Sequence, residues 1–354
     1  MRARYVPMML VVALIAAGFY CYGLGSGGTF YHRLVRAPFA PAIDAPYYRA
    51  SVLHVMLGHV LGLGGSILAF RLAVLACLWA ALFYLAGVMR GTLAWTDGCL
   101  VLLVLMFHPS AMIAYAWTCH PDAVTYLLTA VLLFSRRPWV LAAVAALGAW
   151  NHLAMWAIVC VEAALLWWAF IGAQAKRPVI ATAAGLVVGA VSCKLTLMLC
   201  GVEIVNDRLA LAWGQEFAAL VGYWTLAGWP ILYTLYFAHI VWVPIVMIRL
   251  YRERPRLMWV FLATQLLALA AACCAQDTTR VFAFLAWGPL VYCLVHVLAA
   301  RSGRAGLVLR IVVGAAVVAT IVGPKIFAWK GDIRDTEGAR AHLRAVWASA
   351  SRAR

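Results

Sequence analysis

The sequence predicts an all-α, polytopic integral membrane protein, and three observations lead to this fold class. Apolar residues make up 66% of the 354 residues and charged residues only 11%. Soluble domains are instead about half apolar and about a quarter charged. The mean hydropathy is +0.94, and many apolar runs approach the roughly 20 residues that a straight helix needs to cross a bilayer. This composition excludes an ordinary soluble enzyme and a disordered chain.

About eleven apolar runs are predicted to form transmembrane helices. They lie near Val6–Leu24, Arg71–Met89, Gly98–Trp117, Ala123–Phe134, Trp139–Trp150, Leu153–Phe170, Val179–Cys200, Trp224–Met247, Leu257–Cys274, Val281–Leu298 and Gly306–Val322. Ala123–Phe134 and Trp139–Trp150 are short for a straight crossing, so we expect them to be half-buried, lengthened by flanking residues, or next to a water-filled cavity.

The distribution of Lys and Arg favours two helices at Trp139–Trp150 and Leu153–Phe170. With a cytoplasmic N-terminus, most basic residues between the predicted spans then fall on the cytoplasmic side, as the positive-inside rule requires. Fusing the two runs would move Lys176 and the cluster Arg249–Arg256 outside. The basic tail Lys325–Arg354 fits less well, since it would lie outside in this topology.

We expect one integral membrane domain over residues 1–322, with outer loops at 25–70 and 201–223, followed by a basic C-terminal tail at 323–354. Within the first outer loop, Tyr47–Gly62 is apolar and is predicted to form a helix lying in the membrane interface. The net charge of +16 comes from short clusters between apolar runs, so we expect no nucleic-acid partner. Ten cysteines show no CxxC spacing, and no metal ligands or resident cofactor are predicted; a requirement for a divalent cation stays open.

In this topology most acidic residues of the apolar part gather on the outer face, and ionisable residues at membrane depth are functional candidates because they are costly. Asp44 lies between Pro41 and Pro46 and is followed by Tyr48 and Arg49. A carboxylate at this position suits a general base at the membrane surface. It equally suits the N-cap of a helix that begins near Pro46.

Two short polar motifs precede or join predicted spans. His120-Pro121-Asp122 opens a helix with favourable starting residues, and a His–Asp pair there would also suit a phosphate or a sugar hydroxyl. Asn151-His152 joins two spans with almost no loop. His152 either donates to a phosphate or satisfies exposed carbonyl groups.

Two further cations are candidates for binding an anionic group. Arg280 has a planar guanidinium suited to phosphate, while Asp277 either pairs with it or caps the helix that follows. Lys194 lies inside the run Val179–Cys200 and either extends to the membrane surface or binds an anionic head group.

The layout of residues 1–200 resembles the GT-C superfamily of membrane glycosyltransferases. The resemblance is carried by Asp44-Ala45-Pro46-Tyr47-Tyr48 in the first outer loop, Arg71-Leu72 at the second span, Pro121-Asp122 at a short fourth span, and the tight turn Asn151-His152. The chain departs from the family in two places. The family often has a Lys near the tight turn, and its usual acidic pair in the first loop is a single Asp here.

The resemblance implies an enzyme that takes a sugar from a polyprenyl-phosphate carrier and passes it to a lipid, glycan or protein acceptor on the outer face of the membrane. Asp44 then becomes the general base, and Asp122 a second carboxylate that binds the acceptor or the sugar. The expected substrate-binding residues are Tyr48, Arg49, His120, Asn151, His152 and Lys194. Asp277 and Arg280 join them on their own chemistry, since the resemblance does not extend to them. The Ala- and Arg-rich composition favours a bacterial source, so we expect the inner membrane, with the active site facing the periplasm or exterior.

Other classes of protein stay open. A multi-pass transporter or lipid flippase would explain many spans and intramembrane charges such as Lys194 and Glu162, and it predicts inverted repeats and broken helices. A membrane acyltransferase would need an essential His, for which His120 or His152 could serve. A structural subunit of an envelope-assembly complex would need no chemistry of its own.

Overall fold

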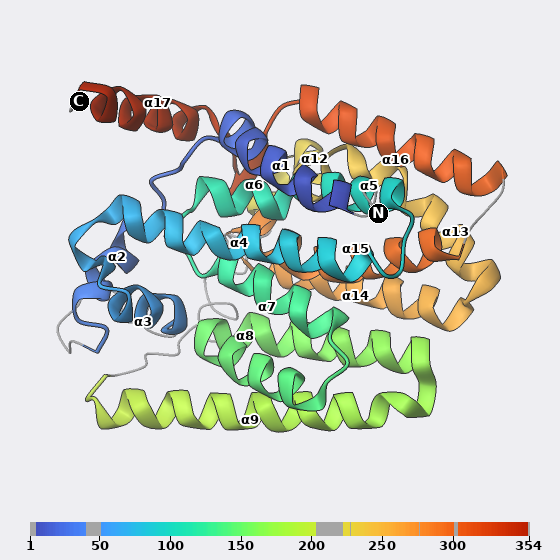
Figure 1. Cartoon of the computed structure of the whole chain (residues 1–354), viewed down its shortest axis with the longest axis horizontal. Helices are drawn as coiled ribbons and strands as arrows, with labels where there is room; N and C mark the ends of the chain where they lie inside the picture. The colour runs from blue at the N-terminus through green and yellow to red at the C-terminus, as the bar shows by residue number, and fades with distance from the viewer. Residues whose placement is uncertain are drawn as a thin grey trace. The chain divides into compact units, whose positions relative to one another are not determined.

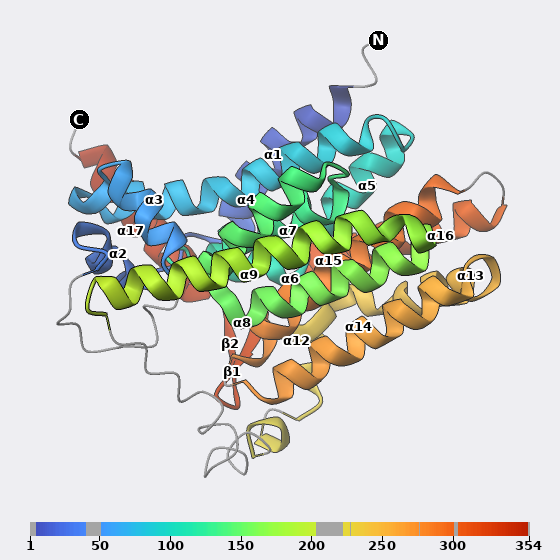
Figure 2. The same ribbon diagram turned by 90° about the horizontal axis from the view of Figure 1, so that it is seen from below.

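The computed structural model describes residues 5–39, 51–202, 222–226, 228–275, 277–300 and 304–352. Helices account for nearly all the regular structure in these residues (Figure 1). A single β-hairpin lies near the C-terminus (Figure 2). The predicted all-α class is therefore confirmed for the described part of the chain, with the hairpin as a small addition.

Several helices have the length and composition of membrane spans. Four stretches qualify alone, namely α4 (Ile67–Met89), residues Pro138–Leu199, α14 (Pro255–Cys273) and α15 (Thr278–Ala299). The number rises to six if each of two bent helix pairs is one span. Shorter apolar helices are α1 (Val6–Tyr22), α7 (Asp122–Phe134) and residues Gly306–Val322 of α16 (Arg304–Val322). The chain is thus a helical membrane protein, but the prediction of about eleven spans is not confirmed.

Two predicted spans are broken by bends. The predicted span Gly98–Trp117 corresponds to α5 (Trp95–Met106) and α6 (Pro109–Ala116), and the chain bends by 49° between them. Trp224–Met247 contains α12 (Pro230–Tyr236), the 3-10 helix η5 (Phe237–Val241) and α13 (Val243–Glu253), with a bend of 57° before α13. Prolines begin α6 and lie in the first turn of α13. A proline has no N–H and its ring clashes with the preceding turn, so a straight helix cannot pass through it easily.

The chain divides into two compact units, which are described separately. Unit 1 comprises Met1–Gly25, Leu82–Ala116 and Phe217–Arg354, and unit 2 comprises Ser26–Ala81 and Trp117–Glu216. The sequence predicts a single membrane domain over residues 1–322, and this prediction remains untested.

Unit 2 contains α2 (Thr29–Arg36), α3 (Leu53–Val60), α7, α8 (Pro138–Ile171) and α9 (Lys176–Leu199). The predicted helix Tyr47–Gly62 corresponds to α3, which begins at Leu53. Helix α2 was not predicted. Within α8, His152 has an extended backbone with φ −167° and ψ 79°. Trp156 Nε1 donates to the carbonyl of Ala145 at 2.9 Å. In a straight helix these residues would lie roughly 16 Å apart, so the chain folds back at His152.

This fold-back confirms that the runs Trp139–Trp150 and Leu153–Phe170 are two helices joined by a tight turn. The two runs lie side by side, because a Cβ on Gly148 would overlap the ring of Trp156. Helix α9 then packs against the first of them. A Cβ on Gly185 would overlap the carbonyl oxygen of Ala142, and one on Gly189 that of Ala146. Small residues spaced by four allow such close backbone contact between membrane helices.

Unit 1 is built around α15, whose residues are nearly all buried against α14, α13, α5 and α6. The region predicted as a basic tail is folded. It forms strands β1 (Ile326–Trp329) and β2 (Asp332–Asp335), then α17 (Glu337–Arg352) (Figure 2). Lys330 and Gly331 between the strands both have positive φ, as a two-residue hairpin turn of the type I′ requires.

Candidate functional site

The carbonyl oxygen of Pro121, at the start of α7 in unit 2, accepts three hydrogen bonds. The backbone N–H of Thr125 lies at 2.9 Å and the Thr125 hydroxyl at 3.1 Å. The Asn151 side-chain amide donates from the α8 turn at 2.9 Å. These bonds fasten the Pro121-Asp122 motif to the tight turn that the sequence places at Asn151-His152.

The orientation of the Asn151 carboxamide follows from the same bonds. Its Nδ2 atom donates to the Pro121 carbonyl and to the Thr125 hydroxyl oxygen, both at 2.9 Å, so both N–H groups are used. Its Oδ1 atom is buried and has no hydrogen-bond partner among the described residues. Asn151 therefore presents an acceptor, which matches a hydroxyl donor and not a phosphate.

Asp122 lies in the first turn of α7 and is 1% exposed. A carboxylate there interacts favourably with the positive end of the helix dipole. The position of Asp122 is explained by its role at the start of the helix, and it is equally compatible with substrate binding. The sequence left both roles open. His152, at the interruption of α8, is half-buried.

An aromatic and histidine cluster joins the first outer loop to the motif before α7. The Tyr31 ring on α2 lies 4.6 Å from that of His54 on α3 and 5.2 Å from that of His120. Trp117 lies 5.0 Å from His120 on its other side. Gly28, with φ 76°, lets the backbone approach closely, since a Cβ there would lie 2.5 Å from the His120 ring. Tyr31 was not singled out from the sequence because its role depends on contacts between distant segments.

Arg71 is buried, although a position at the edge of a predicted span would favour an extended side chain reaching the surface. Its guanidinium hydrogen-bonds the thiol of Cys119, next to His120. Burial raises the pKa of Cys119, and the Arg71 charge opposes this rise. The net rise keeps the Cys119 thiol protonated.

The predicted general base Asp44, together with Tyr48 and Arg49, lies outside the described residues. The described residues that flank this segment lie close to the Asn151 turn. Phe39 and Val52 both pack in a hydrophobic cluster with Trp150 and Leu197. The Val52 N–H also donates to the Trp150 carbonyl at 2.9 Å. Val52, within the first outer loop, thus lies directly beside the Asn151 turn.

Lys194 is exposed on α9, whereas the neighbouring Cys193 packs in this same hydrophobic cluster. An exposed position in an apolar helix is compatible with either of the two roles considered for Lys194, extension to the membrane surface or binding of an anionic head group.

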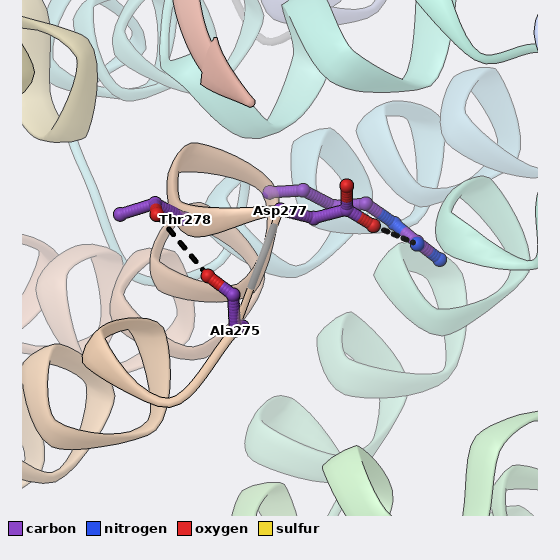
Figure 3. A network of polar contacts seen from close by, with 4 residues as sticks. Ala275, Asp277 and Thr278 are labelled. Atoms are coloured by element: carbon purple, nitrogen blue, oxygen red, sulfur yellow. Dashed lines mark hydrogen bonds and ion pairs between the residues drawn. The ribbon is translucent and has the colours of Figure 1, made fainter. Parts of the chain in front are cut away.

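Asp277 and Arg280 belong to unit 1 and form an ion pair, with Arg280 Nη1 3.2 Å from Asp277 Oδ2 (Figure 3). Asp277 precedes α15 but makes no side-chain cap bond with it. Nearby, the Thr278 hydroxyl donates to the Ala275 carbonyl at 3.2 Å. Of the two structural roles considered for Asp277, the structure shows pairing and not capping. The predicted binding residues are therefore divided between the two units.

Sequence reasoning missed a second ion pair in unit 1. The Nε and Nη2 atoms of Arg310 donate to the two oxygens of the Asp97 carboxylate, at 2.6 and 2.7 Å. Asp97 was not among the candidate residues that the sequence predicted. A lone Arg within the apolar run Gly306–Val322 was the signal that a counter-charge must lie nearby.

The two helix breaks of unit 1 each carry a buried histidine. His108 lies between α5 and α6, His239 lies in η5, and their rings stack at 6.2 Å. His239 Nε2 donates to the Phe107 carbonyl at 3.2 Å, and its Nδ1 accepts from Trp242 Nε1. Carbonyl groups freed by a break need such partners inside a membrane.

Within the described parts of the chain, no group of three or more His, Cys, Asp or Glu residues could hold a metal ion. Comparisons with models of protein families, with curated proteins and with solved structures gave no match. Fold and composition thus define the class as a helical membrane protein.

Proposed function

We propose that this protein is a membrane glycosyltransferase of the GT-C kind. It would move a sugar from a polyprenyl-phosphate carrier to a lipid, glycan or protein acceptor. One observation carries the proposal. Two segments on which the resemblance rests, the Pro121-Asp122 motif and the Asn151 turn, are hydrogen-bonded to each other in unit 2. Val52 of the first outer loop donates to the Trp150 carbonyl beside that turn.

In the proposed reaction, Asp44 removes the proton from an acceptor hydroxyl. The acceptor oxygen then bonds to the anomeric carbon, the bond from that carbon to the carrier phosphate breaks, and polyprenyl phosphate leaves with its electron pair. Arg49, His120 and His152 are the proposed phosphate ligands, since cations stabilise the charge that develops on the leaving group. Asn151 Oδ1 accepts a hydrogen bond from a sugar or acceptor hydroxyl, and Asp122 supports the same group.

The proposed location is a bacterial inner membrane, with the N-terminus in the cytoplasm and the site on the periplasmic or outer side. The fold-back at His152 supports this orientation. Two helices between Pro138 and Ile171 bring Lys176 back to the end of the helix pair at which Arg137 lies, and the positive-inside rule assigns such basic residues to the cytoplasm.

The proposal is tested by native mass spectrometry of the purified chain in nanodiscs, offered a panel of polyprenyl-phosphate sugars. We expect one donor to be retained by the wild type. Asp44→Asn should retain it as well, because a general base is not needed to bind the carrier. Arg49→Gln should bind it more weakly, and Arg334→Gln, which removes an exposed Arg of unit 1, is the matched control. Failure of the wild type to retain any such donor would contradict the proposal.

A transporter or lipid flippase is the second candidate, and two observations favour it. Unit 1 contains two bent helix pairs, and broken helices are typical of transporter binding sites. In unit 2, Glu162 is 1% exposed, and its Oε1 atom has no hydrogen-bond partner among the described residues. Substrate flux into liposomes that depends on Glu162 and persists in Asp44→Asn would favour this candidate.

A further inference from the structure

Helix α17 is a cationic amphipathic helix with few neighbours. It carries Arg340, Arg344 and Arg352 against a single acid, Glu337. Ala339, Leu343 and Val346 recur at helical spacing along one side and are half-buried. Trp347 stands at the edge of this apolar stripe, one turn after Leu343 and Arg344, and is 75% exposed. An apolar stripe bordered by Trp and Arg is typical of helices that lie in a membrane interface.

The first turn of α17 is attached to the end of the apolar helix α1. The Leu24 N–H, just beyond α1, donates to the Ala339 carbonyl at 3.2 Å. Gly23, with φ 79°, permits this contact, because a Cβ there would overlap the Ala339 backbone. Because α1 is apolar and its 17 residues are close to the length that crosses the hydrocarbon core, we infer that α17 begins near the level of the lipid head groups.

Another cation of unit 1 lies near the start of α17, because the Thr336 N–H donates to the Lys325 carbonyl at 3.1 Å. Lys325 Nζ donates to the carbonyl groups of Thr320, Ile321 and Gly323, and so caps the C-terminal end of α16. The charges of Lys325 and Arg340 both act on Cys21 in the last turn of α1. Lys325, at the end of α16, and Arg340, on α17, therefore both lie near the end of α1.

The positive charge at this place is not balanced by carboxylates. Neither Arg340 nor Arg344 has an ion-pair partner among the residues that the structure describes, and Arg340 Nε is buried without a hydrogen-bond partner there. Burial lowers the pKa of Lys325, and the nearby charge of Arg340 acts in the same direction. An anion at this position would relieve this repulsion.

We propose that α17 docks onto the membrane surface and binds anionic lipid phosphates through Arg340 and Arg344, with Trp347 entering the interface. This inference is independent of the proposed glycosyltransferase activity. Each basic residue near an anionic surface contributes enough to change the ratio of docked to undocked helix about fivefold, so removing both arginines should lower it about 30-fold.

Hydrogen–deuterium exchange of the full chain tests this inference in nanodiscs of phosphatidylcholine with or without phosphatidylglycerol. We expect the amides of residues 337–352 to exchange more slowly with the anionic lipid, and the difference to shrink at high salt. The double variant Arg340→Gln/Arg344→Gln should lose the difference, because Gln keeps helix propensity but has no charge. The matched control is Lys330→Gln/Arg334→Gln, which removes the same charge from the neighbouring hairpin and should retain it.

Three outcomes would overturn the inference. Exchange of α17 could be equal in both lipids, or the control variant could lose the difference as fully as the α17 variant. Protection could also rise with protein concentration regardless of lipid, which would identify a second copy of the chain as the partner. A helix that unfolds in the variant is recognised by exchange in detergent, where both variants should match the wild type.

Discussion

Asn151 and Pro121 are joined by a hydrogen bond of 2.9 Å that connects the tight turn of α8 to the start of α7. The same amide nitrogen also donates to Thr125, so both of its N–H groups are used. The orientation of the carboxamide is thereby fixed, and its Oδ1 atom has no hydrogen-bond partner among the described residues. This relationship gives the candidate site in unit 2 a buried hydrogen-bond acceptor, the Asn151 Oδ1 atom, and it leads to the first prediction.

Thr125→Val should weaken both the site and the fold, because it removes the acceptor for Asn151 and the hydroxyl that donates to Pro121. We expect a loss of about 1–2 kcal/mol in stability and a lower rate of transfer. Thr125→Ser keeps the hydroxyl and should behave nearly as the wild type. Thermal unfolding in detergent and an assay of transfer measure the two effects, and full activity in Thr125→Val would refute the role given to Asn151.

Replacing Arg310 alone should destabilise the protein far more than replacing Asp97 and Arg310 together. Arg310→Leu leaves a buried carboxylate without its partner and should cost about 3 kcal/mol, whereas Asp97→Leu combined with Arg310→Leu should recover most of the loss. The exposed pair Arg334–Asp332 is the control, and Arg334→Leu should cost less than about 1 kcal/mol. Equal losses for the two Arg variants would show that burial of Asp97 does not matter.

Two glycines in apolar helices should respond to alanine in opposite ways, because Gly185 lies in the close contact of α9 with α8 and Gly314 does not. Gly185→Ala places a methyl group against the backbone of Ala142, where nothing flexible can move aside, and should destabilise by about 1–3 kcal/mol. Gly314 in α16 has open space around it, so Gly314→Ala should stabilise by about 0.5–1 kcal/mol. Unfolding temperatures of the two variants check the prediction, which fails if both shift in the same direction.

The buried His239 should contribute to stability, because it pairs polar groups at both helix breaks of unit 1. His239→Leu leaves the Phe107 carbonyl and the Trp242 N–H without their partners. Unpaired groups of this kind cost about 1–3 kcal/mol each when buried, so we expect a clear loss of thermal stability. His59→Leu on α3, whose single bond to the Val35 carbonyl is only partly buried, is the comparison and should cost less.

Hydropathy predicted the positions of most helices, and it failed where the chain changes direction inside an apolar run. The predicted run Val179–Cys200 corresponds to α9 (Lys176–Leu199), and Ala123–Phe134 to α7 (Asp122–Phe134). Hydropathy does not reveal the breaks before Pro109 and Val243, because both lie inside runs that are apolar overall despite His108 and His239. Their prolines were the available signal.

The candidate site was only partly predictable for a similar reason. Pairing of Asp277 with Arg280 is local, and the sequence offered it as one alternative. Asp97–Arg310 and Tyr31–His120 join segments far apart in the chain, so no local pattern could reveal them. Asp44, on which the proposed mechanism depends most, lies outside the described residues and stays a prediction.

The central claim is tested most directly by turnover. The full chain is reconstituted with a polyprenyl-phosphate sugar and a panel of acceptors, and release of free polyprenyl phosphate is followed. We predict release that needs an acceptor and is lost in Asp44→Asn, while Asp332→Asn, an exposed carboxylate of β2, stays active. Release that continues unchanged in Asp44→Asn would contradict the assigned base. No release with any donor or acceptor would contradict the glycosyltransferase itself.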